Sequence, residues 1–181
     1  LAQRAKTEGW RLEAVLNNDI VGNSANTSGF KDKRQVRVFS DPAAETQSRE
    51  LARFVEWEVR RQLRDFRVKL VYRSDRFGRG GDHTPFMRQG FSAVRFCEVW
   101  EDFTRQHNDQ DLPEHVDKSY LRNVARANLA AMMALGNAGP TPERVRIDRR
   151  QGHDTRVTWT AVEGVEYVVY HRNSASATWE K

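Results

Sequence analysis

Short apolar runs alternate with amphipathic stretches along the first 138 residues of the chain. Four runs have the length and composition of buried strands: residues 11–16, 36–39, 68–72 and 93–96. Two longer stretches, residues 45–63 and 117–137, repeat apolar residues at helical spacing. Strands that alternate with helices predict an α/β fold, with a largely parallel sheet and helices on both of its faces.

Glycine positions suggest where two shorter helices end. Residues 1–9 have the pattern of the C-terminal end of a helix, which stops at Gly9. A second short helix is expected from Thr84, as N-cap, through Gln89, with Pro85 in its first position and Gly90 after its end.

The pattern changes at residues 139–142 (GPTP), which we interpret as a linker. Beyond it, residues 145–147, 155–159 and 167–170 alternate as short strands separated by turn signals, a pattern typical of an antiparallel β-sandwich. The forty or so residues that remain are too few to close a sandwich. We therefore expect a domain over residues 1–138, and a linker with a partial β-sandwich over residues 139–181.

Composition and charge argue against a specific nucleic-acid site and against a transmembrane segment. The net charge is +5, but basic residues are interleaved with acidic ones, as in residues 56–61 (EWEVRR), which favours a solvated surface over a specific nucleic-acid site. No apolar run is long enough to cross a bilayer. Any targeting segment is expected upstream of Leu1 or not at all. The single cysteine, Cys97, lies in a strand pattern and is expected to be a buried small hydrophobe.

Two polar islands, each following an apolar run, carry the candidate chemistry. Residues 17–19 (NND) follow the first run, and residues 106–111 (QHNDQD) come after the run that ends at residue 96. Carboxylates and imidazoles beyond the ends of parallel strands line the crevice at which α/β sheets build their sites. Asp19 and His107 are therefore candidate ligands for a divalent metal such as zinc. Asp111, in competition with Asp109, is a candidate hydrogen-bond partner for His107. Taken singly, Asp19 also suits a turn and His107 a surface position.

A third island, residues 79–86 (RGGDHTPF), lies between them. It lacks the lysine of a phosphate-binding loop and does not open a dinucleotide motif. Asp82 and His83 are placed where side chains could reach the crevice, although the start of a helix explains them equally well.

Several motifs in order resemble the C-terminal half of a zinc aminopeptidase of metallopeptidase family 28. They are residues 17–22 (NNDIVG), 74–86 (SDRFGRGGDHTPF), 89–94 (QGFSAV), 106–111 (QHNDQD) and 114–117 (EHVD). The resemblance covers residues 1–138 and implies part of a zinc-exopeptidase (phosphorylase/hydrolase-like) domain. The family also includes glutaminyl cyclases.

The resemblance implies two zinc ions in the full-length enzyme, with Asp19 binding one and His107 the other. Asp82 and Asp111 become groups that support the ligands or face the substrate, and His83 is not a ligand. The family's other ligands and its general-base glutamate have no counterpart in this sequence and are expected upstream of Leu1. This segment then contains no catalytic residue and an incomplete metal site, and we expect it to be inactive alone.

The implied activity is removal of N-terminal residues from peptide substrates, and the resemblance implies a secreted or periplasmic bacterial protein. Two alternatives remain open: a non-enzymatic interaction member of the same fold, and a glutaminyl-cyclase-type enzyme with a single zinc. The tail is similar to a fibronectin-type-III-like module in Trp159, residues 167–172 (YVVYHR) and Trp179. Nothing in the sequence indicates the oligomeric state.

Overall fold

The computed structural model describes residues 1–40, 47–76, 79–148, 150, 155–173, 175–176 and 179–180. The chain divides into two compact units, Leu1–Leu135 and Gly136–Lys181, and each is described by itself. No helix within these described ranges is both long and apolar enough to cross a bilayer.

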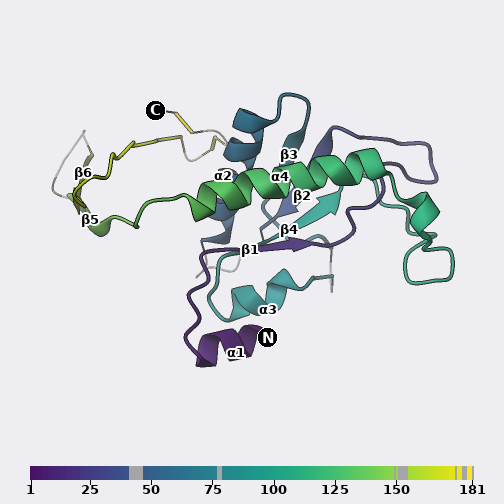
Figure 1. The fold of residues 1–181 in the computed structure, drawn as a ribbon, viewed down its shortest axis with the longest axis horizontal. Coiled ribbons are helices and arrows are strands. Elements are labelled where there is room, and N and C mark those ends of the chain that lie inside the picture. Colours follow the sequence, from purple (N-terminus) through teal and green to yellow (C-terminus); the bar gives the residue numbers. More distant parts are fainter. Residues whose placement is uncertain are drawn as a thin grey trace. The chain divides into compact units, whose positions relative to one another are not determined.

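A four-stranded sheet forms the centre of the first unit, in the order β1-β4-β2-β3 (Figure 1). Strand β1 (Val15–Asn18) runs parallel to β4 (Ala93–Glu98), and β2 (Gln35–Phe39) runs parallel to β3 (Arg67–Val71). The β2 and β4 pair is antiparallel. The predicted α/β fold with a largely parallel sheet is confirmed.

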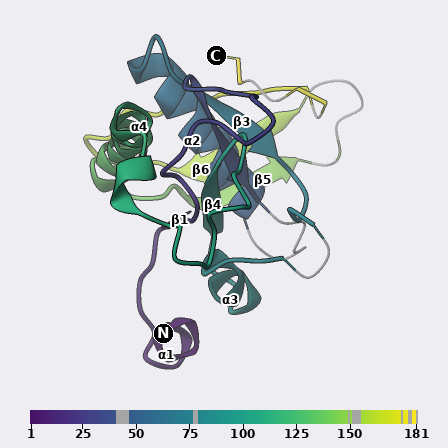
Figure 2. The same cartoon turned by 90° about the vertical axis from the view of Figure 1, so that its right-hand side faces the viewer.

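Helices cover both faces of this sheet. Helices α2 (Ser48–Gln62) and α4 (Lys118–Gly136) pack their apolar faces on one side, where the main core lies. The buried residues of that core are Val36, Val38, Leu51, Ala52, Val55, Val59, Leu63, Phe66, Val94, Phe96, Tyr120, Val124, Ala127 and Ala131. Helix α3 (His83–Arg88) contacts β1 and β4 on the other side, and α1 (Ala2–Thr7) packs against α3 (Figures 1 and 2).

The short helices end where glycine was expected, but α3 begins two residues earlier than expected. Gly9 and Gly90 have φ angles of 66° and 86°, so both adopt the left-handed conformation that closes a helix. Asp82, not Thr84, occupies the N-cap position of α3. The Thr84 hydroxyl instead lies inside the first turn and accepts a hydrogen bond from the Gly81 N–H at 3.4 Å. Cys97 is fully buried on β4, as predicted.

In the described part of the second unit, β5 (Glu143–Asp148) and β6 (Arg156–Thr160) form an antiparallel pair. The strand predicted at residues 167–170 is not formed. The Tyr167 hydroxyl accepts a hydrogen bond from the Val162 N–H at 2.8 Å, and its ring lies 5.6 Å from that of Trp159. The Tyr167 side chain therefore contacts the nearby residues Val162 and Trp159, and its backbone does not pair with β5 or β6.

Candidate metal centre

The parallel pairing of β1 with β4 brings the ends of these strands to the same edge of the sheet. Asp19 directly follows β1, and its N–H donates to the Phe96 carbonyl at 3.1 Å. The Glu98 N–H donates to the Ile20 carbonyl at 2.8 Å, so the chain beyond Asp19 still runs beside β4. His107 lies in the loop that follows β4. Both candidate ligands are thus on segments that leave neighbouring parallel strands at one edge. We predict a separation of about 8 Å or less between their metal-binding atoms, because neighbouring strands lie about 4.8 Å apart and paired metal ions about 3.5–4 Å apart.

Backbone strain marks both segments. Ile20 has a φ angle of 64° and His107 a φ angle of 61°. Positive φ is costly for any residue with a side chain, and most costly for a β-branched residue such as isoleucine. Strain of this kind, about 1–3 kcal/mol per residue, is concentrated at functional sites. Here one strained residue is a candidate ligand and the other directly follows one.

A buried arginine on β4 holds the carboxylate of Asp19. Arg95 is 1% exposed, and its Nε lies 3.0 Å from Oδ2 of Asp19, whose side chain is 34% exposed. The loop before α3 closes on the same group, because a Cβ added to Gly81 would lie 2.8 Å from that oxygen. Asp19 is therefore fixed in orientation while part of its side chain stays accessible to a ligand.

Arg95 belongs to a network of three arginines and three carboxylates. Its Nη1 lies 3.4 Å from Asp75, and Arg79 bridges Asp75 at 3.0 Å and Glu101 at 2.5 Å. Arg37 on β2 lies 2.6 Å from Glu101. Burial would raise the pKa of Glu101, but hydrogen bonds from the two arginines outweigh it and hold that pKa at about 2. The network is charge-balanced, which compensates for the burial of its members.

The same network reaches the residue before His107. The Gln106 side-chain amide donates to Glu101 at 3.3 Å. At the same edge, Asn18, which ends β1, and Asn128 exchange two amide hydrogen bonds, of 3.0 and 2.9 Å, which tie the end of β1 to α4. The positions of both candidate ligands are therefore set by polar contacts as well as by strand pairing.

One buried carboxyl group at this edge lacks a cationic partner. Glu98 ends β4 and is 2% exposed, and its Oε2 accepts the Asn23 N–H at 2.8 Å. Within the described residues, no cation lies within ion-pairing distance of it. Burial, together with the nearby charges of Glu101 and Asp102, raises its pKa to about 8, although Asn23 and Arg37 oppose this.

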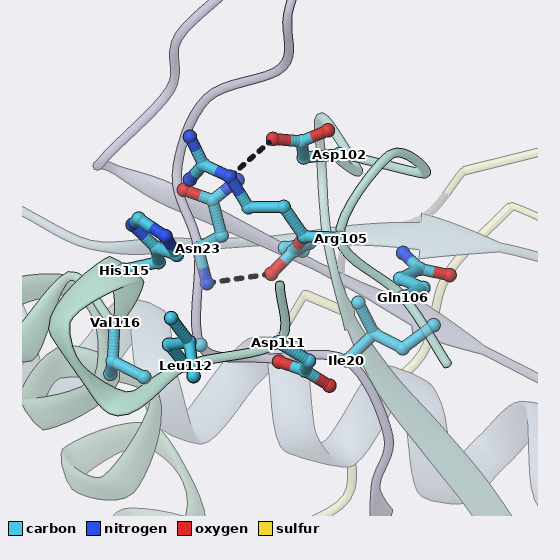
Figure 3. A pocket seen from close by; sticks show the side chains of 11 residues that line it. Ile20, Asn23, Asp102, Arg105, Gln106, Asp111, Leu112, His115 and Val116 are labelled. Atoms are coloured by element: carbon cyan, nitrogen blue, oxygen red, sulfur yellow. Dashed lines mark hydrogen bonds and ion pairs between the residues drawn. The ribbon is translucent and has the colours of Figure 1, made fainter. Parts of the chain in front are cut away.

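Glu98 lines a cavity of about 240 Å³. The other lining residues come from the segment after Asp19 and from the loop around and beyond His107: Ile20, Gly22, Asn23, Asp102, Arg105, Gln106, Asp111, Leu112, His115 and Val116. The Arg105 and Asp102 side chains meet on one side of the cavity, 3.3 Å apart, and Asp111 lies on the opposite side (Figure 3). Buried titratable groups with perturbed pKa in a cleft are typical of functional sites.

Glu98 predicts a pH dependence of stability. Its pKa is raised in the folded state to about 8, against about 4.3 in an unfolded chain, so its stabilising proton is lost as the pH rises through the folded pKa. Between pH 6 and pH 8 the free energy of unfolding should fall by on the order of 2 kcal/mol through this group. Urea denaturation at both pH values measures it.

Glu98→Gln should remove the part of this fall in unfolding free energy that comes from Glu98. Glu114→Gln should leave the fall unchanged, because it changes an exposed carboxylate outside the cavity lining. All other ionisable groups are common to the parent and Glu98→Gln, so the difference between these two proteins isolates Glu98. An unchanged pH dependence in Glu98→Gln would contradict the assignment.

The two remaining predicted residues, Asp82 and Asp111, lie on different segments of the chain. Asp82 follows Gly81 at the start of α3 and is exposed, without a side-chain hydrogen bond to the helix. Asp111 lines the cavity, but the structure records no hydrogen bond between its carboxylate and the His107 imidazole, both of which lie in the described part of the chain. The sequence reasoning missed Arg95 and Glu98, although charged residues within an apolar strand were a visible signal that each has a special role.

Asp19 and His107 supply a carboxylate oxygen and an imidazole nitrogen, which are donors that zinc binds. Across the described residues, however, no group of three or more His, Cys, Asp and Glu side chains could hold a metal ion. The donor types fit zinc, and the ligand set contributed by these residues is partial.

Comparison with known proteins identifies the family. Residues 1–132 match Peptidase family M28. The chain is 36% identical to a "Probable zinc metalloprotease" of Pyricularia oryzae, over 99% of this chain and 43% of that protein. It is 35% identical to a protein of the same description from Leptosphaeria maculans, over 100% of this chain and 49% of that protein. The chain thus spans less than half the length of these relatives.

Two solved structures share the fold. The Legionella pneumophila LapA aminopeptidase matches with a TM-score of 0.57 and 16% identity, over 76% of this chain and 34% of that one. An aminopeptidase from Aneurinibacillus sp. strain AM-1 matches with a TM-score of 0.52 and 16% identity, over 74% of this chain and 29% of that one. With the sheet edge, its two candidate ligands and the match over residues 1–132 taken together, the chain belongs to peptidase family M28.

Proposed function

We propose that this chain forms part of a zinc aminopeptidase that removes N-terminal residues from peptides. In this proposal the enzyme uses two zinc ions, and Asp19 and His107 each bind one. The observation that carries it is the match to Peptidase family M28 across residues 1–132, which includes both residues. The solved structures that share the fold are aminopeptidases, which supports the choice of reaction.

Bound zinc in such a site polarises the scissile carbonyl and lowers the pKa of a bound water. The residues of this chain would orient and hold the ligands. Arg95 fixes Asp19 through one carboxylate oxygen. Glu101 anchors Gln106, the residue before His107. Such outer contacts typically affect metal affinity or activity by about 10–100-fold when they are removed.

Two ligands do not complete a zinc site, because zinc in proteins is usually four-coordinate. We infer that the other ligands and the general base come from a part of the peptidase domain outside these 181 residues. The relatives provide room for it, since this chain spans 43% and 49% of two of them.

The 181-residue chain alone is therefore expected to show no appreciable peptidase activity. Hydrolysis needs the activated water and its base together, and the loss of groups that act as a unit costs orders of magnitude in rate. Aminoacyl-nitroanilides with added zinc test this. Calorimetry should also show weak zinc binding that weakens further at lower pH, because zinc binds only the neutral form of an imidazole. Robust turnover that a chelator abolishes would contradict the expectation.

The proposed function itself is tested on the complete peptidase with the same substrates. We expect release of nitroaniline from unblocked aminoacyl substrates, no release from the N-acetylated forms, loss of turnover after zinc removal, and recovery when zinc is returned. Failure to hydrolyse any unblocked substrate, or turnover that is indifferent to zinc, would overturn the proposal.

A further inference from the structure

The cavity beside β4 is adjacent to both candidate ligands. Ile20, the residue directly after Asp19, lines it, and so does Gln106, the residue directly before His107. The positive φ of Ile20, 64°, fixes how the chain turns from Asp19 into the cavity wall. A substrate whose reacting bond lay between the two candidate ligands would have this cavity next to it.

The size and the walls of the cavity suit one long side chain. Its volume, about 240 Å³, lies below the range of roughly 300–1,000 Å³ that is typical of sites for whole small molecules. Ile20, Leu112 and Val116 contribute apolar surface to the lining (Figure 3). Apolar walls of this kind contact the methylene groups of lysine and arginine favourably while their charged ends reach a polar group.

The polar part of the lining favours a cation. Arg105 is ion-paired with Asp102 at 3.3 Å, so these two charges offset each other. Glu98 and Asp111 then remain as acidic groups, and Glu98 is buried. His115, which is exposed, completes the ionisable lining. Such a buried carboxyl group is costly to ionise in the free chain, and a cation from a ligand would favour its ionised form.

Building on the proposed function, we propose that this cavity receives the side chain of the substrate's N-terminal residue and selects a cationic one, lysine or arginine. The methylene groups lie against Ile20, Leu112 and Val116, and the charged end pairs with Glu98 and Asp111. The enzyme is then an aminopeptidase with a preference for basic N-terminal residues.

Binding to the 181-residue chain tests the cavity without any catalytic step. Lysinamide and norleucinamide share the α-amino group and the four-carbon side chain, and differ in the terminal ammonium. Titrations followed by NMR should give an affinity about tenfold or more higher for lysinamide, the size of effect expected of a hydrogen bond between charged groups. Glu98→Gln should remove most of this difference, and Asp111→Asn, at an exposed position that does not threaten folding, should reduce it.

Glu114→Gln is the matched control, because it removes an exposed carboxylate of the same chemistry from outside the cavity lining. It should leave the preference for lysinamide intact. Equal affinities for the two amides, no saturable binding of lysinamide, or an unchanged preference in both Glu98→Gln and Asp111→Asn would overturn the proposal.

The complete peptidase separates this inference from the proposed function. A higher kcat/KM for lysyl-nitroanilide than for leucyl-nitroanilide, reduced in Glu98→Gln, supports both. Turnover with no preference for the lysyl substrate would overturn the basic pocket and leave the aminopeptidase in place. Lysinamide binding without any turnover would overturn the aminopeptidase alone.

Discussion

Replacing His107 with alanine in the complete peptidase is expected to lower kcat/KM by at least about 100-fold and to reduce its zinc content. The reason is that the substitution removes a direct ligand of the proposed zinc site, whereas loss of an outer partner of a ligand already costs about 10–100-fold. Asp19→Asn should have a comparable effect on activity. The amide keeps the size of the carboxylate but loses the charge that pairs with Arg95 and that would bind the metal in the proposed site. Nitroanilide hydrolysis and metal analysis of the purified variants measure both effects.

His171→Ala provides the control, because it removes an exposed histidine from the second unit. It should leave turnover and zinc content unchanged. Normal zinc content together with normal turnover in His107→Ala would show that His107 is wrongly assigned. His83, which is buried at the start of α3, would then be the histidine to test next.

Most of the fold follows from local patterns, because burial leaves a periodic signature. The apolar face of α2 was visible as residues three and four apart, and Val55 and Val59 are fully buried. All six residues of β4 are buried, in keeping with a strand covered on both faces. The sequence did not reveal that β2 runs antiparallel to β4, since strand order depends on contacts that no local window contains. Residues 167–170 were misjudged because alternation alone does not provide a pairing partner.

The candidate ligands could be placed at a sheet edge because polar residues directly after a strand end up there. What holds them could not be predicted in the same way. Arg95 pairs with Asp75, which is 20 positions away in the sequence. Arg79 pairs with Glu101, which is 22 positions away. Such pairing emerges only when the loops fold over the sheet. The position of Arg95 in an apolar run does predict that it has acidic partners, because buried arginines are almost always paired. It does not indicate which residues those partners are.

The buried arginine also carries the largest expected effect on stability. Arg95→Met keeps an apolar stem of similar length but leaves Asp19 and Asp75 without the charge that lies between them. Breaking a buried pair by removing one partner typically costs about 3–5 kcal/mol. We expect a loss of about 3 kcal/mol, at the lower end of that range. Asp75 keeps Arg79 as a partner, and the Asp19 side chain is 34% exposed and can be hydrated.

Urea denaturation of the 181-residue chain measures this loss as a shift of the midpoint at constant slope. Arg88→Met makes the same chemical change at an exposed position of α3 and should stay within about 0.5 kcal/mol of the parent. Adding Asp19→Asn to Arg95→Met should cost less than the sum of the two single changes, because residues in one ion-pair network are energetically coupled. If Arg95→Met is no more destabilising than Arg88→Met, then the network does not stabilise the edge that carries Asp19. The orientation of that carboxylate would then depend on strand pairing alone.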